Sequence, residues 1–173
     1  MIIRTPCQTC TGMGNVLSIK CYLVLMKYLG EEIYHIIPNR KPFMILDTLV
    51  VEDNHAVSEL FLKSEEWFFQ CHYPGNPILP LTLLVESMTQ TFSATFLPKA
   101  EDKTEIPVIS SLGEIRLKEG SKPGDILRIE ATLQSFKRGI AKGNCKAFKN
   151  GGENPILEFE IVDVLPSQMI RIK

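Results

Sequence analysis

Residues 80–98 read PLTLLVESMTQTFSATFLP, and this stretch decides the fold. It has no glycine and no internal proline between Leu81 and Phe96, which predicts one long helix. Pro80 suits the first helical turn, and Pro98 stops the helix. Apolar side chains cover most of the circumference and Glu86 is the only charged residue, so the helix is expected to be buried.

Strand-like segments lie on both sides of this helix. Two precede it (43–51 and 55–63) and four follow it (106–118, 125–136, 139–148 and 156–165). The breaks Pro123-Gly124, Arg138-Gly139 and Asn150-Gly151-Gly152 are typical of tight turns. Consecutive hairpins predict an α+β fold, in which a curved antiparallel sheet wraps around one long central helix.

Composition narrows the class of protein. The 173 residues are enough for one domain, and 45% of them are hydrophobic, as in an ordinary globular protein. A net charge of −1 argues against a nucleic-acid binder. No apolar stretch is long enough to span a membrane, so no membrane partner is expected. Five scattered cysteines do not form a secreted disulfide framework, which favours a reduced cytoplasmic setting.

The amino terminus differs from the remainder. Residues 1–28 are predicted to be a poorly ordered or weakly helical extension, and residues 29–173 the folded domain. An alternative is that translation naturally begins at Met26. The pair Cys7 and Cys10 has the spacing of a zinc or redox motif, but no second pair and no βαβ pattern accompanies it. We therefore expect neither a metal site nor a redox function there.

The loop before the helix holds the first candidate catalytic residue. It reads FFQCHYPGNPILP at residues 68–80, with His72 between aromatic and proline residues. Prolines stiffen the loop, and apolar neighbours disfavour the imidazolium. His72 is thus predicted to be a neutral general base, the alternative being a structural histidine.

The second candidate is Glu86, the carboxyl group within the apolar helix. A buried, unpaired carboxylate is costly, so this side chain is expected to hold its proton tightly and to serve as a general acid. Gln90 lies one turn further on and is predicted to fix the carboxyl by a hydrogen bond. The alternative is a buried salt bridge to Arg116 or Arg128.

A base and an acid together predict an elimination. A proton leaves the carbon next to a carbonyl while a β-hydroxyl is protonated and departs, a reaction that requires no metal and no redox cofactor. The free N–H groups at the start of the helix are the candidate donors to the carbonyl oxygen.

At these residues the sequence resembles the 3-hydroxyacyl-(acyl-carrier-protein) dehydratases of bacterial type II fatty-acid synthesis, the FabZ/FabA hot-dog family. The family segment Gly-His-Phe-Pro-Gly appears as Cys71-His72-Tyr73-Pro74-Gly75. The family helix Pro-Gly-x-Leu-x-x-Glu-Ala-Met-x-Gln appears as PLTLLVESMTQ at residues 80–90. Weaker matches are PNRKPF at 38–43 with the downstream Asp47, and Pro123-Gly124-Asp125.

This resemblance implies a hot-dog fold and dehydration of a 3-hydroxyacyl thioester to the trans-2-enoyl thioester, in fatty-acid or related polyketide biosynthesis. It implies an acyl carrier protein as partner and a homodimer, often assembled as a trimer of dimers. His72 of one chain would face Glu86 of the other. The acyl chain would lie in an apolar tunnel beside the helix, and Tyr73, Gly75, Leu81 and Gln90 would contact the substrate. Glutamate at position 86 resembles the branch that dehydrates without isomerising.

Two positions depart from the family pattern. The glycine at the helix start is Leu81 here, and the glycine before the histidine is Cys71. The larger side chain of Leu81 would narrow the tunnel, and Cys71 removes backbone freedom. These changes leave open a specialised substrate or a weakened activity.

A basic segment is the candidate docking surface for the carrier. Residues 131–152 contain five basic residues and no acidic one, among them Lys137, Arg138 and Lys142. Such a face would attract an acidic carrier protein, the alternative being a solvated strand face. Two other functions remain open for the whole chain: a hot-dog thioesterase, and a non-catalytic acyl-binding homologue.

Overall fold

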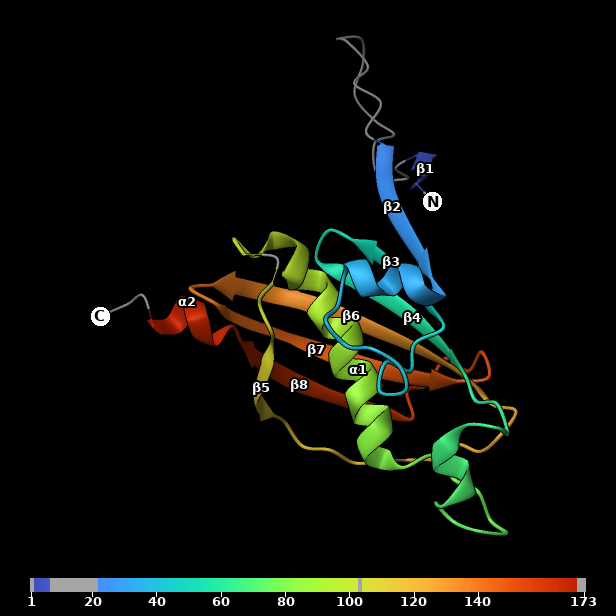
Figure 1. Cartoon of the computed structure of the whole chain (residues 1–173). Helices are drawn as coiled ribbons and strands as arrows, with labels where there is room; N and C mark the ends of the chain where they lie inside the picture. Colours follow the sequence, from blue (N-terminus) through green and yellow to red (C-terminus); the bar gives the residue numbers. More distant parts are fainter. Residues whose placement is uncertain (1, 7–21, 103, 171–173) are drawn as a thin grey trace.

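The computed structural model describes residues 2–6, 22–102 and 104–170 (Figure 1). Its helical elements are η1 (Gly30–His35), η2 (Trp67–Gln70), α1 (Leu81–Phe96), η3 (Leu97–Lys99) and α2 (Pro166–Ile170). Its strands are β1 (Ile2–Pro6), β2 (Tyr22–Leu29), β3 (Thr48–Glu52), β4 (His55–Phe61), β5 (Val108–Leu112), β6 (Ile126–Lys137), β7 (Ile140–Lys149) and β8 (Leu157–Val164).

These strands form one sheet in which every pairing is antiparallel. Their order across the sheet is β1-β2-β3-β4-β6-β7-β8-β5. Helix α1 crosses one face of the sheet and packs against β6, β7 and β4 (Figure 1). The predicted architecture, an antiparallel sheet around one long helix, is confirmed. In the part of the chain that the structure describes, no helix is long and apolar enough to cross a membrane.

Helix α1 has the predicted bounds and is buried for most of its length. Its polar residues are compatible with burial because their hydroxyls bond within the helix. Ser87 donates to the Leu84 carbonyl at 2.7 Å, and Thr91 donates to the Ser87 carbonyl at 2.8 Å. These two hydroxyls are therefore satisfied when the helix packs on the sheet.

Gly143 lets α1 approach β7 closely. A Cβ at this position would collide with the Thr132 carbonyl oxygen and with the Phe92 ring. The ring occupies the space that a side chain on β7 would otherwise fill. Only glycine at this position therefore allows the observed packing.

The predicted turns connect the strands at the expected places. Arg138 and Gly139 join β6 to β7 with φ of 53° and 72°, the left-handed conformation that a two-residue hairpin requires. Strand β3 is shorter than the predicted strand 43–51. The segment 43–47 leaves the sheet, because the Phe43 and Met44 amides donate to the Arg40 carbonyl at 3.0 and 2.8 Å. Similarly, 106–118 forms a strand only at Val108–Leu112.

The segment 1–28, predicted to be a poorly ordered or weakly helical extension, contains β1 and most of β2. Strand β2 was not predicted. It pairs with β3 in the register Met26↔Val51 to Leu29↔Thr48 and crosses the predicted domain boundary at residue 28. Its residues, YLVLMKYL, form an apolar run without alternation, and such a run does not distinguish strand from helix. Cys7 and Cys10 lie outside the described residues.

Candidate active site

The His72 loop is held by its own backbone. The His72 amide donates to the Phe68 carbonyl at 2.9 Å, and the Ile78 amide donates to the His72 carbonyl at 2.9 Å. The Leu79 amide then joins the loop to the Ser121 carbonyl at 2.8 Å. These bonds on both sides of the histidine position its side chain just before α1.

One ring nitrogen of His72 is already engaged. Its Nδ1 lies 2.9 Å from the Ile78 carbonyl oxygen, which can only accept a hydrogen bond. In the neutral ring Nδ1 therefore carries the proton, and Nε2 is the basic nitrogen. The ring is half-buried and stacks on Tyr73 at a centroid distance of 4.1 Å. This arrangement suits a general base.

Tyr73 and Gly75 lie in the exposed turn that follows. Tyr73 and Asn76 exchange backbone hydrogen bonds of 3.0 and 3.3 Å, and Gly75 has a φ of 79°. Leu81 is the first residue of α1, and its half-buried side chain packs against the core. The substitution for glycine thus places an added side chain toward the hydrophobic interior.

Glu86 is held by two amide groups. Its Oε1 accepts a hydrogen bond from Gln90 Nε2 at 2.8 Å and another from Asn39 Nδ2 at 3.2 Å. The Gln90 amide also donates to the Phe43 carbonyl at 2.9 Å and is 2% exposed, so it is itself immobilised. The predicted Gln90–Glu86 hydrogen bond is confirmed.

The alternative of a salt bridge at Glu86 is wrong. Arg116 pairs with Glu114 at 2.8 Å, and Arg128 pairs with Glu130. Glu86 instead lines a small cavity of about 80 Å³. The lining residues are Asn39, Glu86, Thr89, Gln90, Ser93, Pro107, Ile109 and Asp163. His72 does not line this cavity, so the fold of one chain does not bring the predicted base into it.

Asp163 is a member of this cavity that sequence reasoning missed. It is 1% exposed, and burial raises the pKa of its carboxyl to about 7, with a further contribution from the negative charge of Glu86. A hydrogen bond with Ser93 acts in the opposite direction. The signal was present in the sequence: the buried positions 157, 159 and 161 of β8 are apolar, and the next position in this alternation is Asp163.

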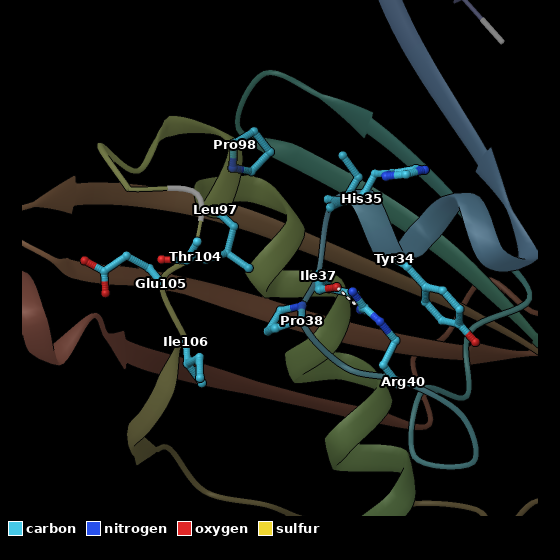
Figure 2. Close-up of a pocket in the computed structure, with 11 residues that line it drawn as sticks. Tyr34, His35, Ile37, Pro38, Arg40, Leu97, Pro98, Thr104, Glu105 and Ile106 are labelled. Atoms are coloured by element: carbon cyan, nitrogen blue, oxygen red, sulfur yellow. Dashed lines mark hydrogen bonds between the residues drawn. The ribbon is translucent and has the colours of Figure 1, made fainter.

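A second, larger cavity lies beside the C-terminal end of α1 (Figure 2). Its volume is about 470 Å³, and it is lined by Tyr34, His35, Ile36, Ile37, Pro38, Arg40, Leu97, Pro98, Thr104, Glu105 and Ile106. Arg40 donates to the Ile37 and Asn39 carbonyls at 3.0 and 2.9 Å, and its guanidinium lies 4.6 Å from the Tyr34 ring centre. The segment around Pro38 and Asn39 contributes to both cavities.

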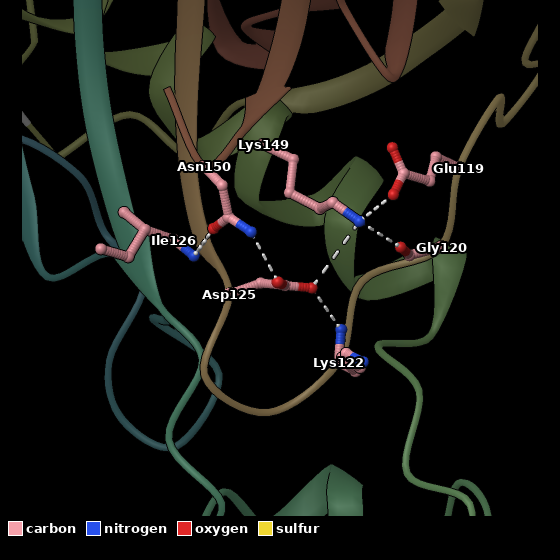
Figure 3. A network of polar contacts seen from close by, with 7 residues as sticks. All are labelled: Glu119, Gly120, Lys122, Asp125, Ile126, Lys149 and Asn150. Atoms are coloured by element: carbon pink, nitrogen blue, oxygen red, sulfur yellow. Dashed lines mark hydrogen bonds and ion pairs between the residues drawn. The ribbon is translucent and has the colours of Figure 1, made fainter. Parts of the chain in front are cut away.

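Asp125 lies at the centre of a polar network (Figure 3). Its carboxylate accepts hydrogen bonds from the Lys122 amide at 2.9 Å and from Asn150 Nδ2 at 2.8 Å, and it lies 3.9 Å from Lys149 Nζ. The network fixes residues 119–125, and these include Ser121, which holds Leu79. The Pro123-Gly124-Asp125 motif is therefore structural.

The predicted docking residues cluster at the β6–β7 turn. Lys137, Arg138 and Lys142 are exposed there, and none of them forms an ion pair with another described residue. This turn lies beside α2, whereas the His72 loop lies near the opposite end of β6 (Figure 1). Within one chain the basic cluster and the histidine are thus well separated.

Comparison with known proteins points to one family. Residues 37–158 match the family described as a FabA-like domain. The chain is 36% identical over 119 residues to a 3-hydroxyacyl-(acyl-carrier-protein) dehydratase FabZ of Chloroflexus aggregans, covering 68% of this chain and 83% of that protein. Another FabZ, from Roseiflexus sp. (strain RS-1), is 33% identical over 140 residues, covering 80% and 96%.

Solved structures show the same fold. The dehydratase heterocomplex ApeI:P of Xenorhabdus doucetiae superposes with a TM-score of 0.67 at 14% identity, covering 81% of this chain and 95% of that one. The E. coli PaaI protein superposes with a TM-score of 0.52 at 12% identity, covering 70% and 77%. The family match spans most of the folded sheet and α1. The chain therefore belongs to the FabA-like family and has the hot-dog fold.

Proposed function

We propose that this protein is a 3-hydroxyacyl-(acyl-carrier-protein) dehydratase of fatty-acid biosynthesis. The observation that carries the proposal is the carboxyl of Glu86, which Gln90 and Asn39 hold at a cavity on an otherwise uncharged helix. The FabZ relatives, 33 to 37% identical, bear the name of this activity. The product is the trans-2-enoyl thioester.

In the proposed mechanism His72 is the base and Glu86 the acid. Nε2 of His72 takes a proton from C2 of the acyl chain, and the electron pair of that bond forms the C2=C3 double bond. The C3–O bond breaks, and the departing hydroxyl takes the proton of Glu86 and leaves as water. The helix-start N–H groups near Leu81 stabilise the charge that develops on the thioester oxygen. The imidazolium then returns its proton to the carboxylate through solvent.

We further propose a homodimer in which the active site forms between chains. Strand β5 is an edge of the sheet. Its Val108 and Ile109 are 48% and 42% exposed, and Ile106, just before the strand, is 64% exposed. An exposed apolar edge strand favours pairing with a second chain. Ile109 also lines the Glu86 cavity, so a partner seated on this edge would bring its own loops to that carboxyl. A trimer of such dimers is the larger assembly that the family resemblance implies.

The apolar and basic surfaces of the protein suggest where the acyl chain and its carrier protein bind. The 470 Å³ cavity beside α1 has Ile37, Leu97 and Ile106 in its lining and would take an apolar chain. Tyr73, Gly75, Leu81 and Gln90 are the proposed substrate contacts. Lys137, Arg138 and Lys142 are the proposed docking residues for an acidic acyl carrier protein in the cytoplasm.

One assay tests the activity. The protein is incubated with a 3-hydroxyacyl thioester, and the enoyl product is followed by ultraviolet absorbance. We expect enoyl product, and we expect H72A and E86Q each to abolish it. The controls H55Q and E160Q replace a histidine and a glutamate on the exposed side of β4 and β8 and should keep full activity. Release of free thiol would identify a thioesterase, and binding without turnover a non-catalytic module; either result contradicts the proposal.

A further inference from the structure

Asp163 has a place in the fold that the proposed mechanism does not use. The inner face of β8 presents Leu157, Phe159 and Ile161 to the core, and Asp163 continues this buried row. It pairs with Ala141 on β7 and with Ile109 on β5. An apolar residue would fill this position without the cost of burying a carboxyl group. A specific role therefore has to account for the carboxyl at this position.

Two buried oxygen atoms at the cavity lack a hydrogen-bond donor in the described part of the chain. Glu86 Oε1 receives donors from Asn39 and Gln90, whereas Asp163 Oδ1 and Gln90 Oε1 are buried without a partner among the described residues. If Asp163 were ionised, both unpartnered atoms would be acceptors and would lie beside a second carboxylate. A proton on Asp163 converts one of its oxygens into a donor. The Ser93 hydrogen bond favours the charged form of Asp163, whereas burial of Oδ1 without any donor from the described residues favours the protonated form.

The charges around the cavity point the same way. None of the residues that line it carries a positive charge. The titratable groups that interact with Asp163 are Glu86 on α1 and the Cys145 thiol on β7. On β5 its pairing partner is Ile109, which has no titratable group. The nearby guanidinium of Arg40 is engaged by the Ile37 and Asn39 carbonyls. Asp163 is buried and Glu86 is half-buried, so two carboxylates at this site, whose lining holds no cation, disfavour each other's ionisation.

We propose that Asp163 and Glu86 form a carboxyl pair that retains one proton, and that Asp163 is a positioning residue that keeps the acid of the site protonated. This inference rests on the proposed dehydratase function. The pair enters turnover with one proton and gives it to the departing hydroxyl. It regains a proton from the His72 imidazolium through solvent, so each turnover is balanced. The acid then titrates as a pair and not as a single residue.

The first test is the pH dependence of turnover in Asp163→Asn. Asparagine keeps the size of the side chain and supplies a permanent donor, so the fold should tolerate it. We expect the pH at which kcat falls to half on the basic side to move down by at least about one unit, because the site then lacks the second carboxyl that shares its proton. KM should change little, since Asp163 is not among the proposed substrate contacts. Glu160→Gln, an exposed position on the same strand, should leave the profile unchanged. An unshifted profile in an active Asp163→Asn protein would overturn the proposal.

The second test does not depend on turnover. Carbon-13 NMR of labelled aspartate and glutamate carboxyls follows their titration in the wild-type protein and in Glu86→Gln. We expect one aspartate to titrate near neutral pH, to be absent from Asp163→Asn, and to titrate at lower pH in Glu86→Gln because the neighbouring charge is gone. An unchanged titration in Glu86→Gln would refute the pair even if the protein proves to be no dehydratase. Conversely, coupled titration without enoyl product would refute only the proposed function.

Discussion

At the scale of single residues, the site depends on hydrogen bonds made by side chains that do no chemistry. Gln90 holds Glu86 and is in turn held by the Phe43 carbonyl, and Asn39 completes the arrangement from a loop 47 positions away. Ile78 selects the tautomer of His72 through its backbone carbonyl. These contacts orient the two proposed catalytic groups before substrate arrives.

Replacing Gln90 tests this orientation. In Q90L the Phe43 carbonyl and the Glu86 carboxyl both lose a donor within a buried region. We expect stability to fall by about 1–3 kcal/mol in urea unfolding, because a buried acceptor is left unsatisfied. We expect kcat to fall more than KM rises, because the carboxyl loses its fixed rotamer. Q90E removes the donor but keeps the shape, so equal kcat in Q90E and wild type would contradict the orienting role.

Asp163 makes the stability of the protein depend on pH. Its pKa is about 7 in the folded state against an ordinary value of 3.8, so between these values the folded state holds a proton that the unfolded chain has released. The free energy of unfolding therefore has its full contribution from this group below pH 4. It falls as the pH rises from 4 toward 7, by up to about 4 kcal/mol. D163N should lack this loss. Urea unfolding at pH 5 and pH 8 measures it, and an equal decline in both proteins would argue against a buried protonated Asp163.

At the scale of elements, the packing of α1 on β7 depends on the absence of a side chain at Gly143. In G143A the new methyl group meets the Phe92 ring and the Thr132 carbonyl. Overpacking of this kind costs about 1–3 kcal/mol. Thermal unfolding should show a lower Tm for G143A and a partial recovery in G143A/F92L, where the smaller side chain gives way. G120A adds a methyl group at ordinary contact distance, 3.7 Å from Ile78, and should leave Tm nearly unchanged.

The whole molecule is expected to be active only as a dimer. If His72 of one chain faces Glu86 of the other, mixing inactive H72A with inactive E86Q restores one intact site per heterodimer. We expect about half the wild-type activity for each heterodimer formed. V108K places a charge on the exposed edge strand β5 and should yield an inactive monomer in sedimentation experiments. No recovery in the mixture, despite exchange of subunits, would place both residues of a site in one chain.

Most of the fold was predictable because it depends on residues that are close together in the sequence. The bounds of α1 followed from an uninterrupted run between Pro80 and Pro98, and the β6–β7 turn followed from Arg138-Gly139. The Glu86–Gln90 contact followed from helical spacing. Strand β2 did not follow, because its apolar run acquires a conformation only through pairing with β3.

By itself, the sequence determined the long buried helix, the hairpins and the identity of the histidine and carboxyl that we propose for catalysis, since each depends on neighbours within a few positions. Only the tertiary structure decided which distant groups surround Glu86. Asn39 and Asp163 reach it from a loop and from the strand β8, 47 and 77 positions away. Periodicity states which face of a strand is buried, but packing alone determines what that face meets.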